Sequence, residues 1–216
     1  MTWERARTDA QKQIRLQEIY AVARQQLLSI PYASISFASI AKELHFSRAN
    51  LYKYFASKED IYLSLLAEET TVFAKQLSDS LQQHAVGDFE RADFIRIWFD
   101  LFVPAQVLRI LFSMAAVILE KNCADTVLID TKKQMMDAQF THVLPVLGPL
   151  FPDQTPHQLI DLQMNLILIG NGVLSFCGLN GHQKALLRRH GLEGMVHADF
   201  ATEYRRSLNS LFGCDL

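Results

Sequence analysis

Hydrophobic residues recur at spacings of three and four along most of the chain, and no sustained alternation bounded by turn residues interrupts them. This period predicts helices rather than strands. The expected helices run from Thr8 or Asp9 to just before Pro31, and then over about 37–44, 48–55, 57–83, 89–103, 105–121, 124–148, 156–179 and 198–212. The pattern therefore predicts an all-α protein.

Serine residues mark the starts of three of these helices. Ser36 and Ser47 each precede a short helical pattern, and Ser57 opens Ser-Lys-Glu-Asp, the form of a capping box. A tight turn at 45–46 separates the two short helices. Two short helices joined by a tight turn are typical of a helix-turn-helix.

Glycine and proline are expected to break the remaining helices. The interruptions are AVGD at 85–88, Pro104, Gly148-Pro149, Pro152, Pro156 and a glycine-rich stretch from 178 to 194. No internal repeat or low-complexity tract occurs.

Charge is distributed unevenly along the chain. Residues 1–58 carry nine Lys or Arg against four Asp or Glu, whereas residues 59–216 carry twelve against nineteen. A basic segment joined to an acidic one suggests a module that binds a polyanion. A merely solvated basic face is the alternative.

The second short helix has the chemistry of a DNA-reading helix. Arg48 and Asn50 can read guanine and adenine by paired hydrogen bonds, while neighbouring groups hold phosphates. Leu51 and Phe55 are expected to anchor the helix inward. The predicted DNA-binding residues are Ser36, Ser47, Arg48, Ala49, Asn50, Tyr52, Lys53, Tyr54 and Lys58.

Residues 19–62 resemble the DNA-binding domain of the tetracycline-repressor (TetR) family of bacterial transcription regulators. The matching positions are Ser36, Ile40-Ala41, Ser47, Leu51-Tyr52, Tyr54-Phe55 and Ser57-Lys58-Glu59. The resemblance implies a three-helix helix-turn-helix domain, placed at 1–58 and joined by a helix from about 58 to 83, followed by a helical domain over 59–216 that binds ligand and dimerises.

Two departures from the family pattern concern the helix-turn-helix itself. His45 stands where the family has glycine, and histidine tolerates a positive φ better than most residues. Ser39 replaces a common acidic residue, so the second helix is expected to lack one partner of its capping box.

The C-terminal helices offer a surface for a second copy of the chain. The pattern over 156–179 is apolar on most of its circumference, which indicates burial on two sides. The resemblance implies a homodimer joined by a four-helix interface, and hence a near-palindromic operator. The expected interface residues are Leu162, Leu166, Ile169, Val173, Phe176, Tyr204, Leu208 and Leu211. Gly170 and Gly172 are expected to permit close packing at the dimer axis, or else a kink beside a pocket.

Aromatic and methionine residues between 94 and 140 suit an adaptable apolar cavity, although such residues more often form plain core. The resemblance implies a small-molecule inducer among these helices, for which we expect a lipophilic or aromatic compound. The predicted ligand-binding residues are Trp98, Phe102, Phe112, Met136, Phe140 and Asn171.

No motif of a catalytic, phosphate-binding or metal site occurs, so we expect neither an enzyme nor a cofactor. The three cysteines lack metal-ligand spacing, and the first residues lack the apolar run of a signal peptide. We expect a cytoplasmic protein without a membrane partner. A repressor released by a small ligand is the favoured function; a helix-turn-helix protein that acts through protein partners or DNA architecture, without an inducer, is the alternative.

Overall fold

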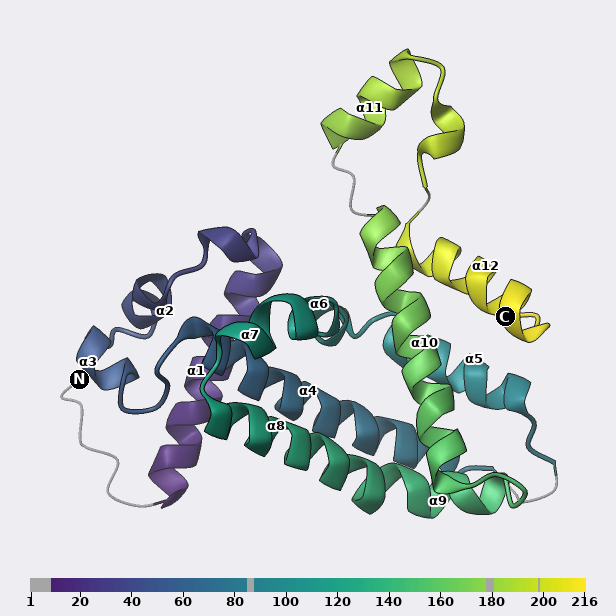
Figure 1. The fold of residues 1–216 in the computed structure, drawn as a ribbon, viewed down its shortest axis with the longest axis horizontal. Helices are drawn as coiled ribbons and strands as arrows, with labels where there is room; N and C mark the ends of the chain where they lie inside the picture. The colour runs from purple at the N-terminus through teal and green to yellow at the C-terminus, as the bar shows by residue number, and fades with distance from the viewer. Residues whose placement is uncertain (1–8, 85–87, 178–180, 198) are drawn as a thin grey trace. The chain divides into compact units, whose positions relative to one another are not determined.

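The computed structural model describes residues 9–84, 88–177, 181–197 and 199–216, and within these ranges it contains helices and no strand (Figure 1). The N-terminal part contains α1 (Asp9–Ser29), the 3₁₀ turn η1 (Tyr32–Ser34), α2 (Phe37–Glu43), α3 (Arg48–Leu51) and α4 (Lys58–Leu81). The rest contains α5 (Arg91–Phe102), α6 (Gln106–Met114), η2 (Ala115–Leu119), α7 (Glu120–Asn122), α8 (Asp125–Ala138), η3 (Gln139–Val143), α9 (Leu144–Leu150), α10 (Pro156–Cys177), α11 (Gly181–Arg189), η4 (Glu193–Met195) and α12 (Phe200–Phe212). The all-α prediction is confirmed.

The chain forms two compact units. Unit 1 combines Met1–Glu69 with Met114–Gln134, and unit 2 combines Thr70–Ser113 with Met135–Leu216. A segment from the middle of the sequence thus packs with the N-terminal helices.

The core of unit 1 is made by the inward faces of α1, α2, α3 and the start of α4. Fully buried side chains from all four helices meet there: Ile19, Ala23, Ile40, Leu51, Ile61 and Tyr62. The Tyr62 hydroxyl donates to the carbonyl of Ala23 at 3.2 Å, so its polar end is satisfied inside the core. Burial and the nearby Glu43 carboxylate raise the pKa of Tyr62, which keeps the hydroxyl protonated.

Aromatic rings fill much of the core of unit 2. Trp98 contacts Phe73 edge-to-face at 4.9 Å between ring centroids and lies 5.5 Å from Phe102. The Trp98 indole donates to the Tyr204 hydroxyl at 3.1 Å, and that hydroxyl donates to the carbonyl of Leu166 at 2.9 Å. This chain of bonds ties α5, α12 and α10 together, because each buried polar atom finds its partner on another helix.

Gly170 permits a close contact within the chain itself. A Cβ atom at this position would lie 2.7 Å from Cε1 of Phe102 and 3.6 Å from Cε2 of Tyr204. Gly170 was expected to allow close packing at a dimer axis. In the structure the groups that pack closely on it are aromatic rings of the same protomer. Gly172 is exposed, and a Cβ added there would meet nothing within 4 Å.

Several expected elements differ in detail from those observed. The helix expected over 48–55 ends at Leu51, and the patterns over 105–121 and 124–148 are interrupted by the π-helical turns η2 and η3. Pro149 lies inside α9 instead of ending a helix. The glycine-rich stretch from 178 to 194 contains α11, whereas most of the AVGD break lies outside the described residues.

Candidate nucleic-acid interface

A reciprocal capping box begins α2. The Ser36 amide donates to Oγ of Ser39 at 3.0 Å, and the Ser39 amide donates to Oγ of Ser36 at the same distance. The expectation that Ser39 removes a partner was wrong, because a hydroxyl oxygen accepts as a carboxylate does. The Ser39 hydroxyl also lies 3.0 Å from Oε1 of the buried Gln26, whose amide donates to Glu43. These bonds fix α2 against α1.

A left-handed residue closes α2 and makes the turn. His45 has φ of 54°, and its amide donates to the carbonyl of Lys42 at 3.1 Å. The next amide, that of Phe46, reaches back to the carbonyl of Ala41 at 2.8 Å. This pair of bonds is a Schellman motif, in which glycine is the usual left-handed residue. The expected tolerance of His45 for positive φ is confirmed.

The short helix α3 is held by one cap and one anchor. Oγ of Ser47 accepts the amide of Asn50 at 3.2 Å, and Leu51 is fully buried. Because Leu51 points inward, the opposite side of α3 faces solvent. The predicted anchor Phe55 is also buried and contacts Tyr20 of α1, with 6.2 Å between ring centroids.

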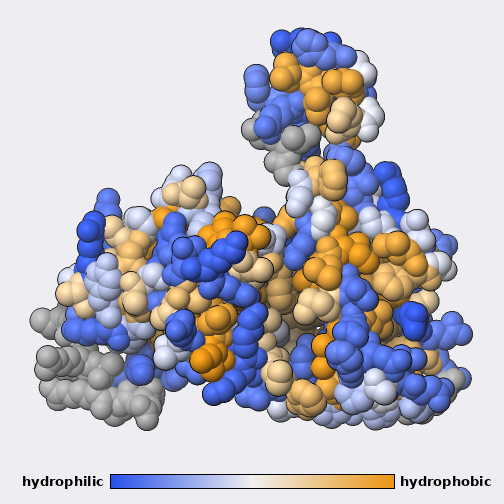
Figure 2. All heavy atoms as spheres, in the orientation of Figure 1, coloured by the Kyte–Doolittle hydropathy of each residue, from blue (hydrophilic) through white to orange (hydrophobic). Residues whose placement is uncertain are grey.

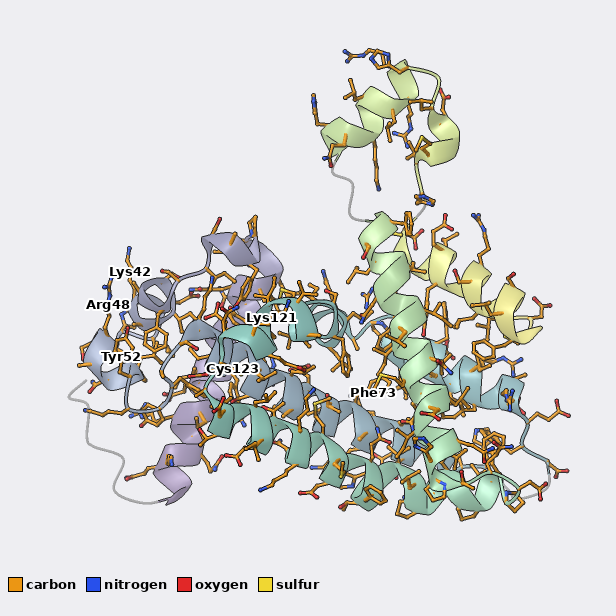
Figure 3. All side chains as sticks on the ribbon, viewed as in Figure 1. Lys42, Arg48, Tyr52, Phe73, Lys121 and Cys123 are labelled. Carbon is orange, nitrogen blue, oxygen red and sulfur yellow. The ribbon has the colours of Figure 1, made fainter. Side chains whose placement is uncertain are left out.

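Exposed side chains from α2 and α3 form a basic and aromatic surface, which we call the α2–α3 surface. Lys42, Arg48, Ala49, Tyr52 and Lys53 are all exposed on it. Figure 3 shows Lys42 extending from α2, with Arg48 and Tyr52 on the neighbouring α3 and the turn after it. The Tyr52 ring packs on Phe37 at 4.5 Å between centroids, which orders an otherwise exposed side chain. Lys42 was not among the residues predicted to bind DNA. Its position as a basic residue near the end of the helix before the turn was the signal that could have identified it.

Within this surface one predicted base-reading side chain already has a partner. Nζ of Lys53 donates to Oδ1 of Asn50 at 2.7 Å, a contact between residues three apart. Asn50 is half-buried, and the ammonium holds its amide in one orientation. Arg48 has an exposed side chain and takes part in none of the ion pairs found between described residues.

The start of α4 carries a second cation close to α2. Nζ of Lys58 donates to the carbonyls of Tyr32 and Ile35 at 3.2 and 2.8 Å, and it lies 4.2 Å from the centroid of the Tyr32 ring. An ammonium has three N–H donors, so one remains for another acceptor. The Tyr32 hydroxyl in turn donates to Glu59 at 2.9 Å. Burial and this carboxylate raise the pKa of Tyr32, so the hydroxyl stays a donor.

Asp60 joins the start of α4 to a distant part of the sequence. Its Oδ2 accepts the amides of Ala56 and Ser57 at 3.0 and 3.1 Å, and Oγ of Ser57 accepts the Asp60 amide at 3.0 Å. The predicted capping box is therefore confirmed. The other oxygen, Oδ1, accepts the amide of Ala124 at 2.8 Å. The link between α7 and α8 is thus bonded directly to the first turn after the helix-turn-helix.

The nine residues predicted to bind DNA lie on or near the α2–α3 surface within unit 1. Ser36, Ser47, Arg48, Ala49, Tyr52 and Lys53 are exposed, whereas Asn50, Tyr54 and Lys58 are half-buried. Ser36 and Ser47 use their hydroxyls as helix caps. A basic surface formed by two short helices, each capped at its start, can present side chains to the major groove of DNA.

The residues predicted at a dimer interface fall into three groups by exposure. Leu166, Val173, Tyr204 and Leu208 are buried inside the protomer, and Leu162 and Ile169 are half-buried. Phe176 and Leu211 are exposed, each with 65% of its surface accessible. The exposed apolar side of α10 also carries Met164 and Leu168, which the prediction omitted because a stripe in the sequence does not show which side faces inward.

The residues predicted to bind ligand also occupy different environments in unit 2. Trp98 and Phe102 are buried in the aromatic cluster, Phe112 and Asn171 are half-buried, and Met136 and Phe140 are exposed. Oδ1 of Asn171 is buried without a hydrogen-bond partner. Within the described ranges, no three His, Cys, Asp or Glu side chains are grouped closely enough to hold a metal ion.

Helix α10 is long and apolar enough to cross a membrane when judged by length and composition alone. Core helices of soluble proteins pass the same test. Within the described structure 22% of the apolar window of α10 is buried, and the buried residues of this helix include Leu159, Leu166 and Gly170. Figure 2 shows further hydrophobic side chains on the visible face of α10.

Comparison with protein families gives two adjoining matches. Residues 19–65 match the family described as bacterial regulatory proteins of the tetR family. Residues 67–212 match the tetracyclin repressor-like C-terminal domain. A search among curated proteins gave no match. The first match covers the α2–α3 surface and the start of α4, and the second covers most of the remaining chain.

Proposed function

Since the chain belongs to the tetR family of bacterial regulatory proteins and is a DNA-binding transcriptional regulator, we propose that it is a homodimeric repressor that binds a near-palindromic operator and leaves it when a small apolar or aromatic ligand binds. In this proposal residues 1–58 read DNA, and residues 59–216 dimerise and bind the ligand. The α2–α3 surface is the observation that carries the proposal. We place the protein in the cytoplasm, where its operator lies.

The roles within the α2–α3 surface follow from charge and exposure. Arg48 is exposed and unpaired among the described side chains, so its guanidinium is available to the paired acceptors of guanine. Asn50 reads adenine in an orientation held by Lys53. Lys42 and Lys53 contact phosphates, because an exposed ammonium at the edge of the surface meets the backbone first.

The exposed apolar side of α10 supports the homodimer. Met164, Leu168 and Phe176 have accessible fractions of 45, 58 and 65%, and Leu211 of α12 has 65%. Large apolar side chains gathered on neighbouring helices mark interaction surfaces. Helices α10 and α12 pack against each other, so the exposed apolar side chains of both helices can contribute to one interface. A second copy of the same pair completes a four-helix interface.

This interface is tested by charge substitution. Leu168→Glu and Phe176→Glu should each shift the molar mass measured by light scattering from dimer toward monomer, since a buried carboxylate without a partner opposes association. Ile129→Glu is the matched control, because Ile129 is 52% exposed on α8 of the other unit. Dimer mass retained in both α10 variants, or lost equally in the control, would contradict the proposal.

A half-buried amide supports the ligand proposal. Oδ1 of Asn171 has no hydrogen-bond partner, and a buried acceptor without one is free to orient a ligand donor. Phe112 is half-buried and offers an apolar contact. Release is tested by titrating the protein–operator complex with candidate compounds and following fluorescence anisotropy of the labelled operator.

One observation favours the alternative function, in which the protein acts through partners or DNA architecture without an inducer. Trp98 and Phe102 contact each other and the surrounding aromatic rings, as core residues do. If no compound releases the operator while Asn171→Leu leaves DNA binding and stability unchanged, this alternative is preferred.

A further inference from the structure

Arg109 on α6 is a half-buried cation that lies over an aromatic ring. Its Cζ lies 3.8 Å from the centroid of the Phe200 ring, and its Nε is buried without a hydrogen-bond partner. Burial lowers the pKa of the Arg109 guanidinium, whereas the Tyr204 hydroxyl raises it. An arginine remains charged under these conditions, so a positive charge is fixed on the face of Phe200.

No protein carboxylate neutralises this charge within the described ranges. The ion pairs found there involve other cations, and Arg109 takes part in none of them. The acidic residue next to Phe200 in sequence is Asp199, whose two oxygens accept the amide and the hydroxyl of Thr202 at 3.1 and 2.8 Å. Arg109 is half-buried, and a cation taken partly out of water is ordinarily paired, because desolvation of an unpaired charge is costly.

The surroundings of Arg109 define what kind of anion fits. Phe112 lies three residues further along α6, on the same face of the helix, and both side chains are half-buried. Phe200 is the ring that the guanidinium faces. An anion bound here would meet the planar set of N–H donors of the Arg109 guanidinium beside an aromatic ring. This fork of donors matches a carboxylate in two parallel hydrogen bonds.

We propose that Arg109 binds the carboxylate of the regulator's ligand, so that the inducer is an organic acid with an apolar or aromatic body and not a neutral or cationic compound. This inference rests on the proposed ligand-controlled function and specifies its ligand class. The carboxylate lies on Arg109, and the body lies along Phe112 and Phe200. The acid supplies the countercharge that the described protein lacks.

The test compares acids with their primary amides, which keep shape and size but lose the charge. Decanoate, 4-phenylbutanoate and 2-naphthoate, each with its amide, are titrated into the full chain by calorimetry. We expect at least one acid to bind about ten- to a hundredfold more tightly than its amide, as the loss of a charged hydrogen bond implies. Arg109→Gln should remove this preference, and Arg109→Lys should keep part of it, because an ammonium retains the charge without the fork.

Arg205→Gln is the matched control. Arg205 also lies over an aromatic ring in unit 2, with Cζ 5.0 Å from the centroid of Phe99, but its side chain is exposed. This variant should keep the acid preference. Equal affinity for acid and amide, a preference that survives Arg109→Gln, or binding of none of the three acids would overturn the assignment of Arg109.

Operator release separates this inference from the proposed function. If amides and acids bind equally and release the operator, the ligand-controlled repressor stands and the role of Arg109 falls. If acids bind through Arg109 without releasing the operator, the role of Arg109 stands and the proposed release mechanism falls. Thermal unfolding of each variant shows whether a lost preference reflects a lost fold.

Discussion

Asp60 offers the sharpest test of how the helix-turn-helix is held in place. Its carboxylate is 1% exposed and accepts three backbone amides, from Ala56, Ser57 and Ala124. In Asp60→Asn one of the two oxygens becomes an NH₂ group, which cannot accept. We expect this group in place of Oδ1, where only the bond from Ala124 is lost, because in place of Oδ2 it would lose the bonds from both Ala56 and Ser57. The free energy of unfolding should fall by about 1 kcal/mol for the lost bond, and by about 1 kcal/mol for the lost negative charge at the start of α4.

The assay is urea unfolding followed by circular dichroism. Ser57→Ala should lose about 1 kcal/mol, because it removes only the cap that receives the Asp60 amide. Asp125→Asn is the control for charge alone, since Asp125 begins α8 beside Ala124 and is exposed. It should lower the unfolding free energy by less than about 0.5 kcal/mol, because a charge at a helix start contributes less when solvent screens it than when it is buried.

The bond to Ala124 can be removed without touching Asp60. Ala124→Pro deletes the amide donor, and Cys123 before it already has the extended backbone that precedes proline, with φ of −96° and ψ of 166°. Combined with Asp60→Asn, it should cost less than the two single changes added together, because both remove the same bond. Additive losses, or an Asp60→Asn protein as stable as the wild type, would refute this account of Asp60.

Four further substitutions have different expected outcomes. Gly170→Ala should destabilise the protein by about 1 kcal/mol, since a Cβ 2.7 Å from a buried ring outweighs the helix propensity gained, whereas Gly172→Ala should stabilise it by about as much in the same urea assay. His45→Gly should raise the unfolding free energy by about 1 kcal/mol by relieving the positive φ, and a decrease would contradict the turn described. Lys53→Ala should reduce the slope of log K against log salt by about one unit, measured by operator anisotropy, and an unchanged slope would exclude a phosphate contact.

The sequence allowed the helix-turn-helix to be predicted closely because its signals are local. Caps at Ser36, Ser47 and Ser57 act on amides three residues away, and each is bonded as expected. A positive φ at His45 was expected because the family pattern has glycine at this position and histidine tolerates that conformation. The α2–α3 surface could be predicted for the same reason, apart from Lys42.

Features made by contacts between distant segments were not predictable. Asp60 was expected to cap α4, but nothing in its neighbourhood indicates that it also binds Ala124. The stripes of α10 are apolar on several sides, so only the fold shows that Leu166 faces inward and Leu168 outward. The π-helical turns η2 and η3 lie within helical patterns that give no sign of them in the sequence.

Selection of bound duplexes from a random DNA library tests the central claim most directly. The purified wild type and the Arg48→Ala variant are each selected at moderate salt. The account predicts an enriched inverted repeat for the wild type, and loss of preference at one base pair of each half-site in the variant, a discrimination of about 1–3 kcal/mol. No enriched repeat, or an identical preference in both proteins, would contradict sequence reading by the α2–α3 surface.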